Sequence, residues 1–482
     1  MIHSFDYCKK KVGDVGRVAG ITGTLAAVTG FKKGRIGEGV VFADGNKGMI
    51  QSFDSHQAQV MLFSRSLDTI GLAVARTGES LTVSVGTKLL GHTITSLGYL
   101  LDKDKEPSWD SESEVLEVVP LGIDRRVKIK QQLRTGLNLV DLILPLGEGQ
   151  RELLIGNKKT GKTEFCLRSM LTQARAGKIC VYCLIGKKHA EITRIEKFMQ
   201  SNKIEDKCVL VASPAGSSPG EIFLAPFTAL AVAEHFRDQG KSSFVVLDDL
   251  TLHAKYFREI SLLSGKFPGR ESYPGDVFYT HARLLERAGS FDINGRTVTI
   301  TALPVAETLA GDLTGYIQTN LMSMTDGHLY FDEDLFLQGM RPAINIFLSV
   351  TRVGRQTQTK LMQQLSGVVL KILKQRQEAE RYLRFGTEMT ESILTLVDKG
   401  DKLKEFFSES SEGIEDNLYP LNLILVLLGL ILTDRWDGHG GHEWIKRFRA
   451  NPNFQKLIDR LVAQSADQKQ LLKSLEADAE FN

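Results

Sequence analysis

The sequence lacks most of the features that mark a secreted or membrane-spanning protein. Its 482 residues include only five cysteines, an odd number without the paired spacing of a disulfide framework, which excludes a small disulfide-built fold. The N-terminal stretch MIHSFDYCKKKVGDVG has no apolar segment after its charged residues, so it does not read as a signal peptide. These absences favour a soluble protein on the cytoplasmic side, in a reducing compartment.

Long apolar runs and an excess of one charge sign are also missing. The longest apolar run, Leu421 to Leu432, would reach roughly 18 Å as a helix, short of the roughly 30 Å hydrocarbon layer of a membrane. We therefore expect a buried helix there. The formal net charge is only +2, which argues against nucleic acid as the default partner.

The one close cysteine pair, Cys180 and Cys183, lies in the apolar run ICVYCLIG. An odd offset along a strand points the two side chains to opposite faces. A buried structural pair is therefore favoured over a redox or metal site.

Three regions differ in their pattern, which predicts a multidomain α/β protein. Residues 1–78 contain short apolar stretches cut by Gly, Asn and Asp, which indicate a β-barrel. In residues 79–355 apolar runs alternate with helical segments after an exposed loop around 102–114, so a mostly parallel sheet covered by helices is expected. Residues 356–482 carry apolar positions at helical spacing and should form a helical domain.

The strongest motif is a complete G-x-x-x-x-G-K-T between the apolar strand RELLI and the helical segment TEFCLRSML. In such a loop the backbone N–H groups wrap phosphates at a helix N-terminus. The lysine supplies charge to the outer phosphates, and the final hydroxyl coordinates Mg²⁺. We therefore predict an ATP or ADP site formed by Gly156, Asn157, Lys158, Lys159, Thr160, Gly161, Lys162 and Thr163.

Two adjacent acids, Asp248 and Asp249, follow the apolar strand SSFVVL. Ligands of open α/β sheets bind at the carboxyl ends of strands. Together with the phosphate loop, this position makes Asp248 the second predicted Mg²⁺ ligand, directly or through water.

These segments and their flanking text resemble the alpha subunit of F-type ATP synthases. The resemblance runs from about Gly16 to Phe385 and includes ELLIGNKKTGKT, VVLDDL, PGRESYPGDVFYTHARLLERA, TALPVAETLAGDLTGYI and RPAINIFLSVTRVG. It implies a barrel, a RecA-like α/β domain and a helical bundle. It also implies assembly with catalytic beta-type subunits in a ring of three alpha and three beta subunits around a central gamma-type shaft.

The stretch Gly186-Lys187-Lys188 separates this chain from hydrolysing relatives. In catalytic beta subunits and export ATPases, the resemblance places the glutamate of a G-E-R here, which aligns the attacking water. A protonated lysine only donates hydrogen bonds and cannot be an ordinary general base. Alpha subunits typically carry glutamine, so Lys187 departs from them as well, and a non-catalytic subunit is expected.

The resemblance also places an arginine finger at Arg352, which alpha subunits extend into the neighbouring catalytic site. A fixed guanidinium there stabilises charge on the transferring phosphoryl group. By the same matching, Ser323 and Val350 should line the subunit interface. Thr351 stands where the family usually has serine and keeps the hydroxyl.

At the base end of the nucleotide, Phe336, Arg341 and Pro342 resemble the family's contacts to adenine, offering an aromatic or guanidinium face. The family's Q-x-Q pair falls near Glu409 and Ser411, where its amides are missing. An ordinary solvated loop remains the alternative reading of this region.

Two alternatives concern the assembly. The chain starts almost at the barrel, without the usual amphipathic helix that reaches the peripheral stalk, which would fit a repurposed F-type-like motor such as those of mycoplasmas.

A homohexameric export or Rho-like ATPase is the other class. It is disfavoured by the missing glutamate and by a barrel that offers only Phe31, Phe42, Phe53 and Phe63 for stacking. Phe385–Glu391 matches the lever region that faces the shaft, with a plain helix turn as the alternative.

Overall fold

The computed structural model describes residues 4–54, 57–64, 69–101, 112–384, 391–408 and 418–481. The chain divides into two compact units. The first comprises Met1–Ile129, Glu148–Lys158 and Gln173–His328, and the second comprises Lys130–Gly147, Lys159–Thr172 and Leu329–Asn482. Most of the predicted loop at 102–114, most of the lever segment, and both Glu409 and Ser411 lie outside the described residues.

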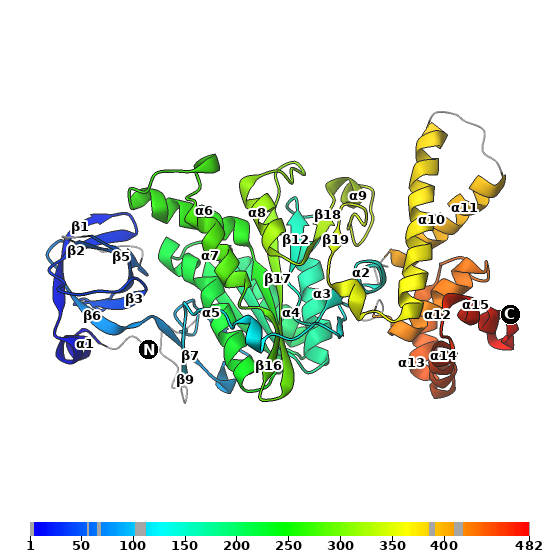
Figure 1. Cartoon of the computed structure of the whole chain (residues 1–482), viewed down its shortest axis with the longest axis horizontal. Helices are drawn as coiled ribbons and strands as arrows, with labels where there is room; N and C mark the ends of the chain where they lie inside the picture. The colour runs from blue at the N-terminus through cyan, green and yellow to red at the C-terminus, as the bar shows by residue number, and fades with distance from the viewer. Residues whose placement is uncertain are drawn as a thin grey trace. The chain divides into compact units, whose positions relative to one another are not determined.

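The N-terminal part of the first unit is a closed barrel of six antiparallel strands in the order β1-β2-β5-β4-β3-β6 (Figure 1). Alternating apolar residues such as Val28, Ile50 and Val60 fill its interior. The strands are β1 (Val15–Thr22), β2 (Leu25–Thr29), β3 (Glu38–Phe42), β4 (Lys47–Phe53), β5 (Gln57–Leu62) and β6 (Ala73–Ser80). The predicted barrel is confirmed.

A short helix that the sequence analysis missed, α1 (Phe5–Val12), precedes the barrel. The Ser4 hydroxyl accepts a hydrogen bond from the backbone N–H of Tyr7, which caps the helix start. Cys8 is buried against Val41 and Ala75 of the barrel. The helix is thus held by one apolar stripe, while Lys9, Lys10 and Lys11 form its last turn.

The apolar runs predicted as strands form a parallel sheet in the first unit, in the order β12-β17-β15-β13-β14-β8. Nearly every residue of β13 is buried, as expected for a strand covered on both faces. The strands are β8 (Thr93–Ile94), β12 (Glu152–Gly156), β13 (Ile179–Lys187), β14 (Cys208–Pro214), β15 (Ser243–Asp248) and β17 (Arg296–Glu307). β16 (Gly289–Ile293) pairs antiparallel with β17.

Helices cover this sheet, and α5 (Pro219–Asp238) is buried along most of its length. The Ser218 hydroxyl accepts from the backbone N–H of Glu221, and Pro219 occupies the first turn, where it removes no helical hydrogen bond. The other helices of this unit are α4 (His189–Ser201), α6 (Leu250–Leu263), α7 (Asp276–Leu285) and α8 (Tyr316–Met324).

The first unit also contains a separate two-stranded antiparallel sheet, in which β7 (Thr82–Val85) pairs with β9 (Glu112–Val115).

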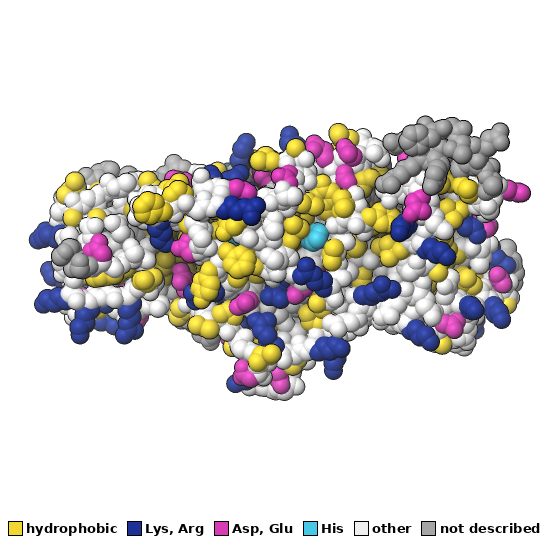
Figure 2. Space-filling model, turned by 45° about the horizontal axis from the view of Figure 1, so that its top comes forward, with side chains coloured by type: hydrophobic (Ala, Val, Ile, Leu, Met, Phe, Trp, Pro, Cys, Tyr) yellow, Lys and Arg dark blue, Asp and Glu magenta, His cyan; other side chains and the backbone are white. Residues whose placement is uncertain are grey.

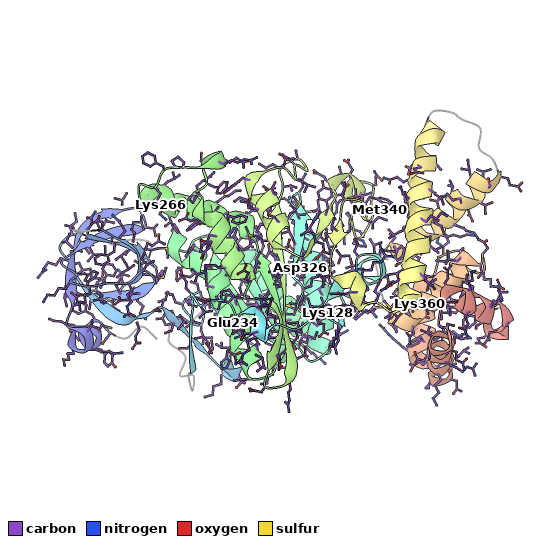
Figure 3. The ribbon with its side chains drawn as sticks, viewed as in Figure 1. Lys128, Glu234, Lys266, Asp326, Met340 and Lys360 are labelled. Atoms are coloured by element: carbon purple, nitrogen blue, oxygen red, sulfur yellow. The ribbon has the colours of Figure 1, made fainter. Side chains whose placement is uncertain are left out.

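Two buried ionic clusters lie in the first unit. Arg76 in the barrel contacts Asp14 and Glu38, each at 2.8 Å. Arg287 pairs with Glu234, which Figure 3 labels on α5. Because a buried charge is costly unless paired, removing one partner from either cluster should destabilise the fold by about 3–5 kcal/mol.

The first unit also buries a pair of histidines, His253 on α6 and His281 on α7. His253 Nδ1 lies 3.0 Å from His281 Nε2, and its Nε2 lies 3.0 Å from the Phe223 carbonyl oxygen. Burial lowers the pKa of His253 to about 4, although the Phe223 carbonyl partly opposes the shift. Burial and the neighbouring His253 lower the pKa of His281 well below its usual value. Both rings are therefore neutral in the fold at pH 7.

This pair predicts a loss of stability in acid. In the unfolded chain the histidines bind protons below a pH of about 6.5, whereas folded His253 binds one only near pH 4. The free energy of unfolding is therefore highest above pH 6.5 and decreases as the pH falls from about 6.5 to about 4. For His253 alone the loss should be about 3 kcal/mol. Urea unfolding of the wild type at pH 7 and pH 4.5 tests this. In the double variant His253→Phe/His281→Leu, the free energy of unfolding should differ less between the two pH values than in the wild type. The control His189→Gln removes an exposed histidine and should show the same difference as the wild type.

The second unit holds the remaining helices. Around its start lie β10 (Gln132–Leu133), paired with β11 (Leu146–Gly147), and α2 (Asn138–Ile143). α3 (Lys162–Arg175) and β18 (Gly327–Phe331) extend across the division between the units, and β18 neighbours β19 (Val350–Thr351). The later helices are α9 (Glu333–Leu337), α10 (Lys360–Arg384), α11 (Glu391–Phe407), α12 (Leu421–Leu432), α13 (Gly441–Ala450), α14 (Pro452–Gln464) and α15 (Gln468–Ala477).

The apolar run at Leu421–Leu432 forms α12, whose residues from Leu423 to Ile431 are buried, as predicted. Within the described ranges, no helix is both long enough and apolar enough to cross a membrane. All five cysteines, including the pair in β13, are buried, and none of them forms a disulfide. Short 3-10 helices lie at Thr87–Leu89, Ile123–Arg125, Glu205–Lys207, Arg270–Ser272, Gly354–Thr357 and Ala479–Phe481.

Candidate functional site

The predicted phosphate loop joins the end of β12 at Gly156 to the start of α3 at Lys162. Within it, Lys159 (φ 62°) and Gly161 (φ 100°) take positive φ values. Position 161 requires glycine, because a side chain at this φ would be strained. Thr160 and Lys162 are only 2% and 7% exposed. The loop therefore has the backbone reversal that a phosphate cradle needs.

The first half of the loop is tied to the segment that follows β17. The Asn157 Oδ1 atom accepts hydrogen bonds from the Thr308 hydroxyl at 2.6 Å and from the Gly311 backbone N–H at 2.8 Å. Lys158 Nζ lies 3.4 Å from Glu307 Oε2, with the Lys158 side chain largely exposed. Asn157 thus has a structural task in fixing the loop.

The strands that carry the loop and the acidic pair end at the same edge of the sheet. β12, β17, β15 and β13 run parallel, with Gly156 level with Glu307 and Leu184 level with Asp248. Since parallel strands bring their carboxyl ends together, the start of the phosphate loop, Asp248 and Lys187 share this edge.

Lys187 at the end of β13 bridges both acids. Its Nζ atom lies 2.7 Å from Asp248 Oδ1 and 3.1 Å from Asp249 Oδ2, and all three side chains are mostly buried. Burial alone would lower the pKa of Lys187, but the two carboxylates outweigh it and raise that pKa above its ordinary value. The ammonium therefore stays charged and cannot accept a proton from water.

The remaining carboxylate oxygens also have partners. Asp248 Oδ2 accepts from the Tyr182 hydroxyl at 3.0 Å, and Asp249 Oδ1 accepts from the Leu252 backbone N–H at 2.6 Å, where it caps α6. As they stand, these acids are matched to a cation of the chain and do not offer an open ligand set to Mg²⁺. Thr163 lies half-buried in the first turn of α3. The prediction that Thr163 and Asp248 hold Mg²⁺ stays a prediction.

No group of three or more His, Cys, Asp or Glu side chains is arranged to hold a metal ion in the part of the chain that the structure describes.

The three residues predicted at the base end are neighbours, but they play different parts. The Arg341 guanidinium lies 3.5 Å from the centre of the Phe336 ring and donates to the carbonyl of Met340, which Figure 3 labels. Arg341 and Pro342 line a cavity of about 50 Å³ together with Thr160, Gly161, Glu164 and Phe165. Phe336 does not line that cavity.

Arg341 and Pro342 also border a second cavity in the same unit, of about 310 Å³. Its other walls come from the turn after α9 and from α10 and α11, through Gln338, Met340, Leu373, Gln377, Lys404 and Phe407. Arg341 and Pro342 therefore line both the small cavity beside α3 and the larger cavity beside α10 and α11.

The turn that carries Arg352 is fixed by close contacts. The Thr351 hydroxyl donates to the Pro145 carbonyl at 2.8 Å, and a Cβ atom at Gly354 would lie 1.5 Å from the same oxygen, so only glycine fits there. Arg352 itself is exposed. Beside it, three large apolar side chains reach solvent, Phe347, Leu348 and Val350, with exposed fractions of 42%, 49% and 41%.

Ser323, the other residue predicted at an interface, is exposed on α8. Its hydroxyl donates to the backbone carbonyls of Thr319 and Asn320 within the same helix. Its position at a surface agrees with an interface role, which stays a prediction.

Sequence reasoning missed Tyr182 and Thr308 as parts of the site. Tyr182 is fully buried in β13, and its hydroxyl reaches Asp248. A tyrosine inside a strand buried on both faces needs a polar partner, and that signal was present in the run ICVYCLIG. Thr308 offered no such signal, because its contact with Asn157 spans 151 positions of the chain.

The barrel, the parallel sheet and the phosphate loop at a helix start define a phosphate-loop nucleotide-binding protein with a helical C-terminal part. The ATP synthase alpha/beta family, nucleotide-binding domain, matches residues 136–351. The alpha subunit of mitochondrial ATP synthase from Neurospora crassa is 39% identical over 484 residues, covering 97% of this chain and 87% of the relative. The alpha subunit from Neorickettsia sennetsu is 38% identical over 406 residues, covering 82% and 80%. The chain belongs to this family, among its alpha subunits.

Proposed function

We propose that this chain is the non-catalytic, nucleotide-binding alpha-type subunit of an F-type rotary ATPase. The observation that carries the proposal is Lys187, an ammonium held by Asp248 and Asp249 where hydrolysing relatives place a water-aligning glutamate. A cation in that place cannot activate water. The chain then binds ATP or ADP and leaves hydrolysis to a neighbour.

Nucleotide binding follows from the phosphate loop. Backbone N–H groups between Gly156 and Lys162 face the phosphates, and the start of α3 adds the positive end of its dipole. Lys162 contributes a point charge to the outer phosphates. Arg341 and Pro342 are proposed to meet the base, since they line the cavity beside Thr160 and Gly161.

The chain's contribution to catalysis is proposed to be Arg352, acting in the site of a beta-type subunit. Its exposure and the exposed apolar side chains of Phe347, Leu348 and Val350 support a subunit boundary there, because such side chains are usually covered by a partner. The partners are then catalytic beta-type subunits in a ring around a gamma-type shaft. Any membrane association is through that complex.

The homohexameric alternatives gain little support. Figure 2 shows Lys and Arg side chains over the barrel, and Lys32, Lys33 and Arg35 are exposed. Phe42 and Phe63, however, are 0% and 5% exposed, so they offer no face for stacking bases. Lys187 argues equally against a self-sufficient export ATPase.

The mass of the native complex, with its subunits identified, tests the proposal. We expect alternating copies of this chain and of a catalytic subunit with a carboxylate at the matching position. A ring made only of this chain would contradict the proposal. A proton ring and peripheral stalk in the complex would distinguish an ATP synthase from a repurposed motor.

A further inference from the structure

The Lys187 ammonium forms ion pairs with two neighbouring carboxylates, Asp248 and Asp249. We propose that its ammonium replaces the divalent cation in this chain's own nucleotide site, so that the site binds ATP or ADP without needing Mg²⁺. The inference rests on the nucleotide-binding function proposed above and specifies which form of the ligand this site takes.

The first step is the saturation of the carboxylates. Of the four oxygens of Asp248 and Asp249, one from each acid contacts Lys187, and the other two accept from the Tyr182 hydroxyl and the Leu252 backbone N–H. A divalent ion bound directly here would compete with these donors for the carboxylate oxygens. It would also stand next to an ammonium, whose charge repels it.

The second step is the position of the cation. Lys187 ends β13, and the acids end and follow β15, the adjacent parallel strand. The phosphate loop leaves β12 at the same edge of this sheet. The ammonium therefore stands on the side of the sheet where phosphates are expected, and it neutralises charge that the acid pair would otherwise direct at them.

The third step compares lysine with the glutamine implied for alpha subunits at this position. A neutral amide leaves two uncompensated carboxylates at the strand ends, which repel a bare triphosphate and attract a dication. The Lys187 ammonium offsets one of these two negative charges, because its Nζ atom lies 2.7 Å from Asp248 Oδ1 and 3.1 Å from Asp249 Oδ2. The exchange of one side chain thus weakens the site's need for metal-bound nucleotide.

Calorimetric titration of the full chain with ATP, in excess EDTA and in excess Mg²⁺, tests the inference. For the wild type we expect the two dissociation constants to agree within about threefold. Lys187→Gln should bind in Mg²⁺ but weaken by about tenfold or more in EDTA. Lys188→Gln, an exposed neighbour with the same change of charge, should behave as the wild type.

Because Lys187→Gln leaves two buried acids without their cation, its folding is checked by thermal melting. Lys187→Arg, which keeps the positive charge, should retain binding in EDTA. Wild-type ATP binding that collapses in EDTA, with intact binding in Mg²⁺, would overturn this inference alone. Absence of ATP binding under both conditions would overturn the nucleotide-binding function itself and the inference with it.

Discussion

Replacing Arg352 with alanine should reduce ATP turnover by the assembled complex by roughly three to five powers of ten. In the role proposed for Arg352, the substitution removes a fixed guanidinium from beside the transferring phosphoryl group, where charge develops in the transition state. The turn that presents Arg352 should persist, because Thr351 and Gly354 hold it against Pro145. Steady-state hydrolysis by the reconstituted complex, with assembly checked by mass, measures the effect.

The control for this experiment is Arg355→Ala, which removes an exposed arginine from the same turn. It should leave turnover within a factor of about two. ATP binding to this chain by itself should be unchanged in Arg352→Ala. A mutant complex that forms the ring and turns over at the normal rate would refute the role of Arg352 in trans.

The second large effect is expected for Lys162→Ala in this chain's own site. The lysine is only 7% exposed at the start of α3, and we propose that its charge contacts the outer phosphates. Without it, ATP affinity should fall by about a hundredfold or more, since a charge-assisted contact to phosphate is lost. The shift in melting temperature that ATP produces should vanish at moderate ATP concentrations.

Lys197→Ala, an exposed lysine on α4, is the matched control and should keep the full thermal shift. If Lys162→Ala showed the same ATP-dependent shift as the wild type, the nucleotide would have to be bound elsewhere. The assignment of residues 156–163 as the phosphate site would then fail.

The parts of the fold that sequence reasoning captured are those governed by local pattern. Strands buried on both faces, such as β13, read as continuous apolar runs, and α12 coincides with the longest of them. The phosphate loop was recognisable because its glycine, lysine and threonine positions follow directly from backbone geometry and charge. By contrast, α1 escaped notice, because its apolar stripe rests on little more than Phe5 and Cys8.

The contacts that decide the chemistry were not predictable, because they join distant positions. Lys187 could be recognised as a departure from a catalytic glutamate, but not as the partner of two acids on the adjacent strand. Similarly, Phe336 was grouped with Arg341 as a base contact, but the stacking of the Arg341 guanidinium on the Phe336 ring was not foreseen. Such pairings depend on strand register and side-chain direction, which one sequence does not specify.

The most direct test of the central claim is steady-state ATP hydrolysis by the purified chain without any partner, alongside calorimetric ATP binding to the same sample. We expect binding without measurable turnover, since Lys187 provides no base for water. Brisk hydrolysis that disappears in Lys162→Ala would show that this chain is itself catalytic, which would contradict the account.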